Sequence, residues 1–181
     1  MEYVIRKATA DEYTTVRDFY YTMIEWLDTA EYGPGWKKDI YPSPRDLISA
    51  LENGELWVCE LDGKFIASMI INSSSVEGYN DVNWIVKTDP SRVSCLHALG
   101  VLPEYHGSGL STKMVVKAIE IAKSKGHIAL RLDVLSGNLP AERLYPKLGF
   151  KYIGEQQIYY EDTGLTDYKL FEYLIIDKFN F

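Results

Sequence analysis

His97 is well suited to remove a proton near neutral pH, because an unperturbed imidazole has a pKa of about 6.5. It lies in the apolar stretch SCLHALGV, residues 94–101, which is typical of a buried strand. Side chains alternate along a strand, so we expect Cys95, His97, Leu99 and Val101 to share one face. The alternative is a core histidine that is hydrogen-bonded to a neighbour.

A glycine-containing loop follows this strand directly. The sequence continues as PEYHGSGLS, with Gly107 and Gly109, and a helical pattern begins at Leu110. The free N–H groups and the dipole at a helix N-terminus favour an anion such as a phosphate. Alternatively, the two glycines only supply turn conformations.

Two common phosphate-binding motifs do not match this loop. A P-loop requires Gly-Lys-Ser/Thr, whereas Leu110 follows Gly109. A dinucleotide fingerprint requires a third glycine, whereas Thr112 stands there. Asp133, at the end of the next predicted strand, occupies the place of a ribose-binding acid. A dinucleotide-dependent oxidoreductase therefore stays open as an alternative, although it leaves the first 93 residues unexplained.

The elements that must position these residues follow from hydrophobic periodicity. We expect helices over residues 10–29, 44–52, 110–125 and 139–148, and strands over residues 3–7, 56–61, 64–73, 94–101, 129–135, 152–159 and 168–175. The strand–helix–strand unit over residues 94–135 predicts two parallel strands with a right-handed crossover. The expected fold is α/β (α+β), with a mixed, mostly antiparallel sheet around this central βαβ unit and with flanking helices. We expect a single domain over residues 1–181.

Composition limits the classes of partner. The net charge of −7 argues against nucleic acid and anionic membranes, and it favours a cationic acceptor such as an amine. Cys59 and Cys95 show neither disulfide nor metal-ligand spacing, so we expect no metal. No apolar run is long enough to span a membrane, and the N-terminal MEYVIRKAT does not resemble a signal peptide. We expect a cytoplasmic protein, for which a homodimer is compatible with the sequence.

Two motifs resemble the GNAT acyltransferase superfamily. The stretch VLPEYHGSGLS is similar to its acetyl-CoA signature, with its key positions at His106, Gly109 and Ser111. The stretch NLPAERLYPKLGF is similar to its second motif. The positions of that motif that match in register are Asn138, Ala141, Leu144, Tyr145, Gly149 and Phe150. The stretch CLHALGV also resembles a strand of arylalkylamine N-acetyltransferases, with His97 on its second histidine and Cys95 in place of the first.

The resemblance implies a GNAT-like fold and an enzyme that uses acetyl-CoA as co-substrate. It implies that the backbones of Leu99 and Val101 contact the pantetheine arm, and that the Leu99 N–H polarises the thioester carbonyl. Asn138 would cap its helix and contact the same arm. The pyrophosphate would be held by the loop residues His106, Gly107, Ser108, Gly109, Leu110, Ser111 and Thr112.

The resemblance further implies that Tyr145 protonates the leaving thiolate, and His97 is the candidate base. Pro146 should disturb the helix beside Tyr145. We expect Trp84 and Cys95 in the substrate pocket, whereas Arg131 and Asp133 are expected to face solvent or each other. The predicted reaction is direct acetyl transfer to a primary amine of a small molecule. A non-catalytic acyl-CoA sensor is the second alternative.

Overall fold

The computed structural model describes residues 3–175, which form a seven-stranded sheet in the order β1-β2-β3-β4-β5-β7-β6. The strands are β1 (Val4–Lys7), β2 (Leu56–Leu61), β3 (Lys64–Asn72), β4 (Val93–Val101), β5 (Ala129–Leu135), β6 (Lys151–Tyr160) and β7 (Gly164–Leu174). The helices are α1 (Tyr13–Leu27), α2 (Pro44–Glu52), α3 (Leu110–Ser124) and α4 (Leu139–Lys147). Short 3₁₀ helices are η1 (Ala10–Glu12), η2 (Glu77–Tyr79), η3 (Pro90–Arg92) and η4 (Pro103–Tyr105). Only β4 and β5 pair in parallel among these strands, so the predicted mixed α+β fold is confirmed.

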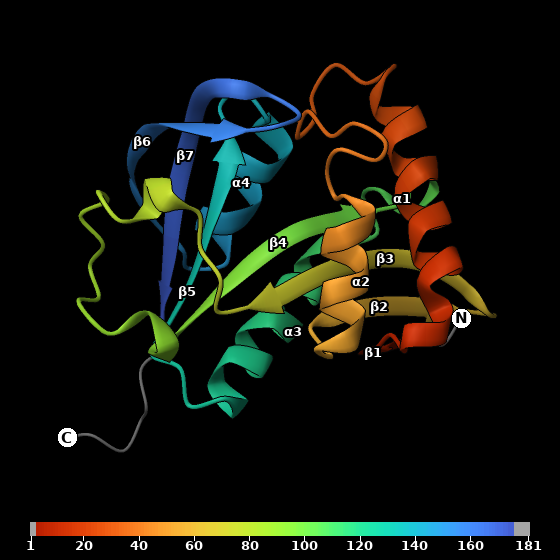
Figure 1. The fold of residues 1–181 in the computed structure, drawn as a ribbon, viewed down its shortest axis with the longest axis horizontal. Helices are drawn as coiled ribbons and strands as arrows, with labels where there is room; N and C mark the ends of the chain where they lie inside the picture. The colour runs from red at the N-terminus through yellow and green to blue at the C-terminus, as the bar shows by residue number, and fades with distance from the viewer. Residues whose placement is uncertain (1–2, 176–181) are drawn as a thin grey trace.

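Helices cover both faces of the sheet (Figure 1). Helices α1 and α2 pack on one face through an apolar cluster that includes Phe19, Leu47 and Ala98. Helix α3 packs on the other face through a larger cluster that includes Met114 and Leu132. Burying an apolar helix stripe on each face stabilises this layered arrangement.

The two parallel strands at the centre of the sheet separate after a short pairing. Residues Val93 to Cys95 of β4 pair with Ala129 to Arg131 of β5, and no pairing between the two strands is found beyond them in the described chain. Figure 1 shows β4 and β5 diverging as a V from this point. The edges of both strands that face the V therefore keep unpaired backbone groups, which makes the opening a natural place for a ligand.

Strand β4 contains a bulge at Ala98, whose φ is 49°. The register of β4 against β3 shifts by one residue between Ser68 and Ile70 of β3. The left-handed conformation of Ala98 is unfavourable for a residue with a Cβ. The Tyr20 hydroxyl of α1 donates a hydrogen bond of 2.8 Å to the Ala98 carbonyl, and this contact helps to hold the bulge.

The bulge overturns the predicted alternation along β4. Leu96, Leu99 and Val101 all pack with the α3 cluster, whereas His97 follows Leu96 and therefore points to the opposite face. One extra residue in a strand shifts every later side chain to the other face. His97 thus does not share a face with Leu99 and Val101, contrary to the sequence-based expectation.

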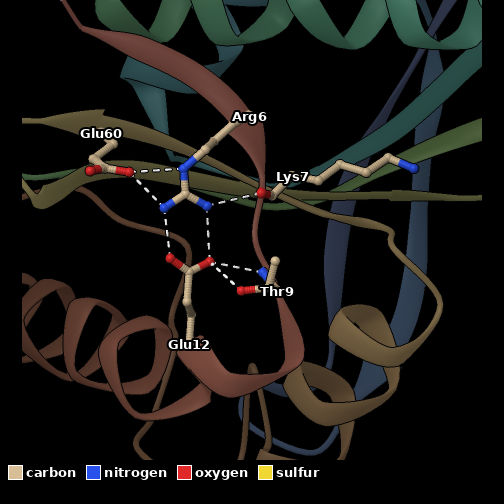
Figure 2. Close-up of polar contacts among 5 residues, drawn as sticks. All are labelled: Arg6, Lys7, Thr9, Glu12 and Glu60. Carbon is tan, nitrogen blue, oxygen red and sulfur yellow. Dashed lines mark hydrogen bonds and ion pairs between the residues drawn. The ribbon is translucent and has the colours of Figure 1, made fainter.

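A bidentate arginine fixes the start of α1 (Figure 2). The Arg6 guanidinium of β1 binds Glu12 at 2.6 and 2.9 Å and Glu60 of β2 at 2.6 and 2.8 Å. Glu12 also accepts hydrogen bonds from the N–H and hydroxyl of Thr9. These bonds, led by Arg6, lower the pKa of Glu12 to about 2.

Helix α4 ends one residue after Pro146, so the proline lies in its last turn. The N–H groups of Leu148 and Phe150 both bond the Tyr145 carbonyl and close the helix. Pro146 therefore disturbs only the helix end. Asn138 occupies the N-cap position, but its side chain makes no capping bond, contrary to expectation. Glu142 accepts a hydrogen bond from the Gly137 N–H there instead.

Candidate active site

A cavity of about 530 Å³ occupies the opening between β4 and β5. Its walls come from the end of α1, the loop between α1 and α2, β4, the glycine loop, β5, α4 and the β6–β7 hairpin. Its size is in the usual range for small-molecule and cofactor sites. The predicted site residues that line it are His97, Leu99, Val101, His106, Gly107, Ser111, Asn138 and Tyr145.

The glycine loop forms one end of this cavity. Gly107 and Gly109 have φ of 76° and 81°, and nothing lies within 4 Å of a Cβ built on either. Gly109 is the N-cap of α3, and the first turn of that helix has no acidic residue. Because the helix begins at Leu110, the N–H groups of Ser111 and Thr112 have no intrahelical partners. Such N–H groups, with no acidic side chain in the turn, favour an anion.

Four of the predicted loop residues do not line the cavity: Ser108, Gly109, Leu110 and Thr112. The Ser108 hydroxyl donates to the Tyr105 carbonyl at 2.6 Å and stabilises the turn. The Leu110 side chain is buried beneath α3. Only the backbones of these two residues remain candidates for contact with a ligand.

His106 connects the loop to the end of β4. Its Nε2 lies 2.8 Å from the Val101 carbonyl, so this nitrogen carries a proton and donates it. The ring also packs edge-on against Trp26 of α1, with ring centroids 4.8 Å apart. The imidazole therefore holds the loop against the end of β4, and Trp26 lines the cavity beside it.

The backbone of β4 presents two N–H groups to the opening. Leu102 donates its N–H to Ile66 of β3 at 3.0 Å. Successive N–H groups of a strand point in opposite directions, so those of Val101 and Leu99 point away from β3 and toward the β5 side. The Val101 carbonyl is already bonded to His106, which leaves the two N–H groups as the donors.

Tyr145 of α4 lines the cavity and is only 7% exposed. Its ring packs against Phe150 and Phe171, with centroid distances of 5.4 and 6.0 Å. Burial and the nearby negative charge of Asp133 raise the pKa of Tyr145. The hydroxyl therefore holds its proton at neutral pH and can donate it to a strongly basic group.

His97 lines the same cavity in a fixed tautomer. Its Nε2 lies 3.0 Å from both the Asn72 side-chain oxygen and the Ser74 carbonyl. A carbonyl only accepts hydrogen bonds, so Nε2 carries the proton and Nδ1 is the free acceptor. Burial lowers the pKa of His97. The ring is thus neutral near pH 7 and able to take up a proton.

Asp133 of β5 lines the cavity, whereas the sequence predicted that it faces solvent or Arg131. It is half-buried at the cavity wall, and it does not face solvent. Its Oδ2 accepts hydrogen bonds from Tyr79 at 2.9 Å and from Tyr160 at 2.7 Å. Burial raises the pKa of Asp133 above its ordinary value, and the two hydroxyls and His97 offset only part of this rise. The carboxylate that the dinucleotide alternative assigned to a ribose is therefore bonded to two tyrosines.

Trp84 and Cys95 do not line the cavity, contrary to expectation. Both are buried in an apolar cluster beneath Tyr79, where the Trp84 indole donates to the Tyr79 carbonyl at 3.0 Å. Arg131 lies over the Trp84 ring, 4.4 Å from its centroid. Trp84 and Cys95 thus pack beneath Tyr79, and the Tyr79 hydroxyl in turn positions Asp133.

The segment that carries Trp84 is anchored by a buried ion pair. Glu172 of β7 is fully buried and binds Arg131 at 2.9 Å. Glu172 also accepts from the N–H groups of Ile85 and Val86, while Arg131 donates to the Val86 carbonyl. Arg131 therefore binds Glu172, so the expectation that it faces solvent or Asp133 is wrong.

The far end of the cavity is aromatic and acidic. It is lined by Trp36 and Tyr41, by Tyr160 and Tyr168 of the last two strands, and by Asp162 in the turn between them. The loop before α2 crosses this turn at Gly35, whose φ is 79° and where a Cβ would meet the Thr163 methyl at 2.6 Å. A glycine is needed there so that the loop can approach the turn and close the cavity.

Within residues 3–175, no helix is both long and apolar enough to pass through a membrane. No group of three or more histidine, cysteine, aspartate or glutamate side chains in this part of the chain is arranged to hold a metal ion.

Comparisons with known proteins point to one family. Residues 20–150 match the profile of the acetyltransferase (GNAT) family. The chain is 29% identical over 150 residues to an uncharacterized N-acetyltransferase of Methanocaldococcus jannaschii, covering 82% of this chain and 61% of the relative. It is 37% identical over 84 residues to the thialysine N-epsilon-acetyltransferase of Mus musculus, covering 46% of this chain and 49% of the relative. The chain thus spans about half to three fifths of the length of these two relatives.

Solved structures show the same fold. The PaiA N-acetyltransferase of Thermoplasma acidophilum, in complex with coenzyme A, superposes with a TM-score of 0.69. The match covers 97% of this chain and all of the other at 20% identity. The similarity at this level concerns the fold.

Proposed function

The chain belongs to the acetyltransferase (GNAT) family, and from this premise we propose that it transfers the acetyl group of acetyl-CoA directly to the primary amine of a small molecule. The observation that carries the proposal is the continuity of the cavity. It joins Gly107 and Ser111 of the glycine loop to His97, Asp133 and Tyr145. The end proposed to bind phosphate and the end proposed to transfer protons thus share one cavity.

The residues at the loop end fit the pyrophosphate of acetyl-CoA. The first turn of α3 offers N–H groups without an acidic neighbour, and the glycines let a phosphate approach the backbone. No lysine or arginine among residues 3–175 lines this cavity, so backbone N–H groups and His106 are the donors proposed there. The N–H groups of Leu99 and Val101 would hold the pantetheine arm, with Asn138 opposite them.

The chemistry follows from the groups around the middle of the cavity. Acetyl-CoA supplies an activated acetyl group through its thioester. The Leu99 N–H would stabilise negative charge on the carbonyl oxygen during transfer. His97, through Nδ1, would take the proton released by the attacking amine, and Tyr145 would give its proton to the leaving sulfur. The acceptor enters as an ammonium, so it would lose one proton to His97 before attack. As the C–N bond forms and the C–S bond breaks, the nitrogen would lose a second proton, which replaces the one that Tyr145 gives to the sulfur.

Asp133 has a separate role in this proposal. Its carboxylate would draw an ammonium toward His97 and away from solvent, because a buried negative charge attracts a cation more strongly than an exposed one does. Tyr79 and Tyr160 fix the orientation of the carboxylate.

A small acceptor is favoured because the loop before α2 and the β6–β7 turn meet over the far end of the cavity at Gly35. The mouse relative is named for a small amine-bearing substrate, which is consistent with this choice. A protein N-terminus is the competing acceptor, and it would need this end to open.

Calorimetry tests the cofactor part of the proposal directly. We expect acetyl-CoA and CoA to bind, and NAD not to bind. Absence of acetyl-CoA binding at high micromolar concentration would contradict the proposal. Binding without CoA release from any amine would instead support the acyl-CoA sensor.

A further inference from the structure

Two carboxylates from separate elements line the far half of the cavity. Asp133 extends from β5, and Asp162 lies in the turn between β6 and β7. A site that binds a single ammonium needs one carboxylate. The proposed acetyl transfer accounts for Asp133 and leaves Asp162 without a role.

Asp162 is buried without a cationic partner among the described residues. It is 5% exposed, and the N–H groups facing its carboxylate are its own and that of Thr163. The exposed Lys37 is close enough to favour its negative charge, but no ion pair within 4.0 Å joins the two. Burial and the charge of Asp133 raise the pKa of Asp162. A buried carboxylate in this state gains strongly from a cation supplied by a ligand.

Aromatic rings connect the two carboxylates. The Tyr160 ring lies 6.2 Å from that of Tyr41 and 5.0 Å from that of Tyr168, and Trp36 lies 6.3 Å from Tyr41. The Tyr160 hydroxyl bonds Asp133, and Asp162 follows two residues later in the chain. Aromatic faces favour cations and also pack against methylene groups. The wall between the carboxylates therefore suits a short hydrocarbon chain with a positive charge at each end.

The same walls disfavour an amino acid. In the part of the chain that the structure describes, the residues that line the cavity include no lysine or arginine, and the Nε2 protons of its two histidines, His97 and His106, are already donated to backbone carbonyls. A carboxylate on the acceptor would meet Asp133 and Asp162 without a compensating cation, and such like-charge contacts are costly.

We propose that the acceptor is a small diamine, whose reacting amino group lies against Asp133 and whose second ammonium lies against Asp162. This inference rests on the proposed acetyl transfer and names its substrate class. It distinguishes a diamine from both a monoamine and an amino acid.

The test compares acceptors that differ by one amino group. Initial rates of CoA release are measured for straight-chain diamines of three to six carbons, for monoamines of equal length, and for lysine. We expect kcat/KM for the best diamine to be at least about 10-fold higher than for the monoamine of equal length. The difference should come from a lower KM, because the diamine makes one additional charge-assisted contact. Equal values for diamines and monoamines, or a preference for lysine, would overturn the inference.

A pair of variants locates the second ammonium. Asp162→Asn should lower kcat/KM for the diamine to about the value for the monoamine, whereas Glu161→Gln should leave the preference for the diamine unchanged. Glu161 is exposed in the same turn and does not line the cavity, so it controls for the loss of one charge. A diamine preference that survives in a folded Asp162→Asn protein would contradict the assignment. The comparison of acceptors on the unaltered protein needs no variant to fold.

Failure of the proposed acetyl transfer can be told apart from failure of this inference. If no amine releases CoA, the transfer proposal fails, and calorimetry of a diamine and a monoamine with the protein alone then tests the site. Tighter binding of the diamine, lost in Asp162→Asn, supports the two-carboxylate site. Equal or absent binding of both overturns it.

Discussion

The Tyr160 hydroxyl donates a hydrogen bond of 2.7 Å to the Asp133 carboxylate at the wall of the central cavity. The two residues lie 27 positions apart, on β6 and β5, two strands that both pair with β7. This bond, with that from Tyr79, fixes the orientation of the half-buried Asp133 carboxyl group where the proposed cationic acceptor would enter.

Replacing Asp133 by asparagine should lower kcat/KM by about 10²-fold or more, the range that removal of a proton-transfer or ion-pairing group produces. The change removes the charge but keeps the shape. The dissociation constant of acetyl-CoA, measured by calorimetry, should not change. Asp167→Asn, an exposed change on β7, is the control and should leave kcat/KM unaltered. Equal activity of the two variants would remove Asp133 from the site.

Tyr145→Phe should lower kcat about 10-fold or more, because the leaving sulfur loses its proton donor. Little change is expected in the affinity for acetyl-CoA, since the ring and its contacts with Phe150 and Phe171 remain. Steady-state kinetics together with calorimetry separate the two effects. An unchanged kcat would exclude Tyr145 as the acid.

His97 should set the acidic limb of the pH–rate profile. A base acts in its neutral form, and burial lowers the pKa of His97, so the limb should lie below pH 6.5. Activity should rise as pH increases through that limb. His97→Ala should shift the limb and reduce kcat/KM. A profile identical to that of the unaltered protein would reject His97 as the base.

The sequence predicted the elements well, because long periodic segments carry their own signal. Helix α3 was expected over residues 110–125 and is found at Leu110–Ser124. Strand β7 was expected to begin at residue 168 but begins at Gly164, because its first residues pair with β6 in a hairpin. Cross-strand pairing of this kind is not visible in local periodicity.

The candidate site was less predictable, because it depends on one bulge and on long-range contacts. The extra residue at Ala98 reversed the faces of Leu99 and Val101, and no local pattern marks it. Only a weak sequence signal marked Asp133 as a site residue, namely that an acid in the alternating strand ALRLDVL needs a buried partner. Its partners Tyr79 and Tyr160 lie 54 and 27 residues away, beyond any local pattern.

Gly109→Ala should weaken acetyl-CoA binding by about 10-fold and lower stability by about 1 kcal/mol, the usual cost of a Cβ at positive φ. Gly63→Ala is a matched control, because Gly63 has φ of 78°, has open space around it and lies in the β2–β3 turn. Both variants should lose stability by thermal denaturation, but only Gly109→Ala should lose affinity by calorimetry. Equal affinities would exclude the loop as the phosphate site.

Glu12 should make stability fall at acidic pH. Its pKa in the folded protein is about 2, below the ordinary value of 4.5. Its contribution is therefore complete above pH 4.5 and is lost as pH falls through 4.5 toward 2. Melting temperatures of the unaltered protein and of Glu12→Gln should differ most at neutral pH and converge near pH 2. A constant difference across this range would show that the Arg6 contact does not act through charge.

Acetyl-CoA-dependent acetylation of a small-amine panel tests the central claim most directly. CoA release is followed with a thiol reagent, and the acetylated amine is identified by mass spectrometry. The proposed function predicts equal amounts of CoA and N-acetylated product for at least one small amine, with both reduced in Tyr145→Phe. No CoA release above spontaneous hydrolysis with any amine, from a protein that binds acetyl-CoA, would contradict it.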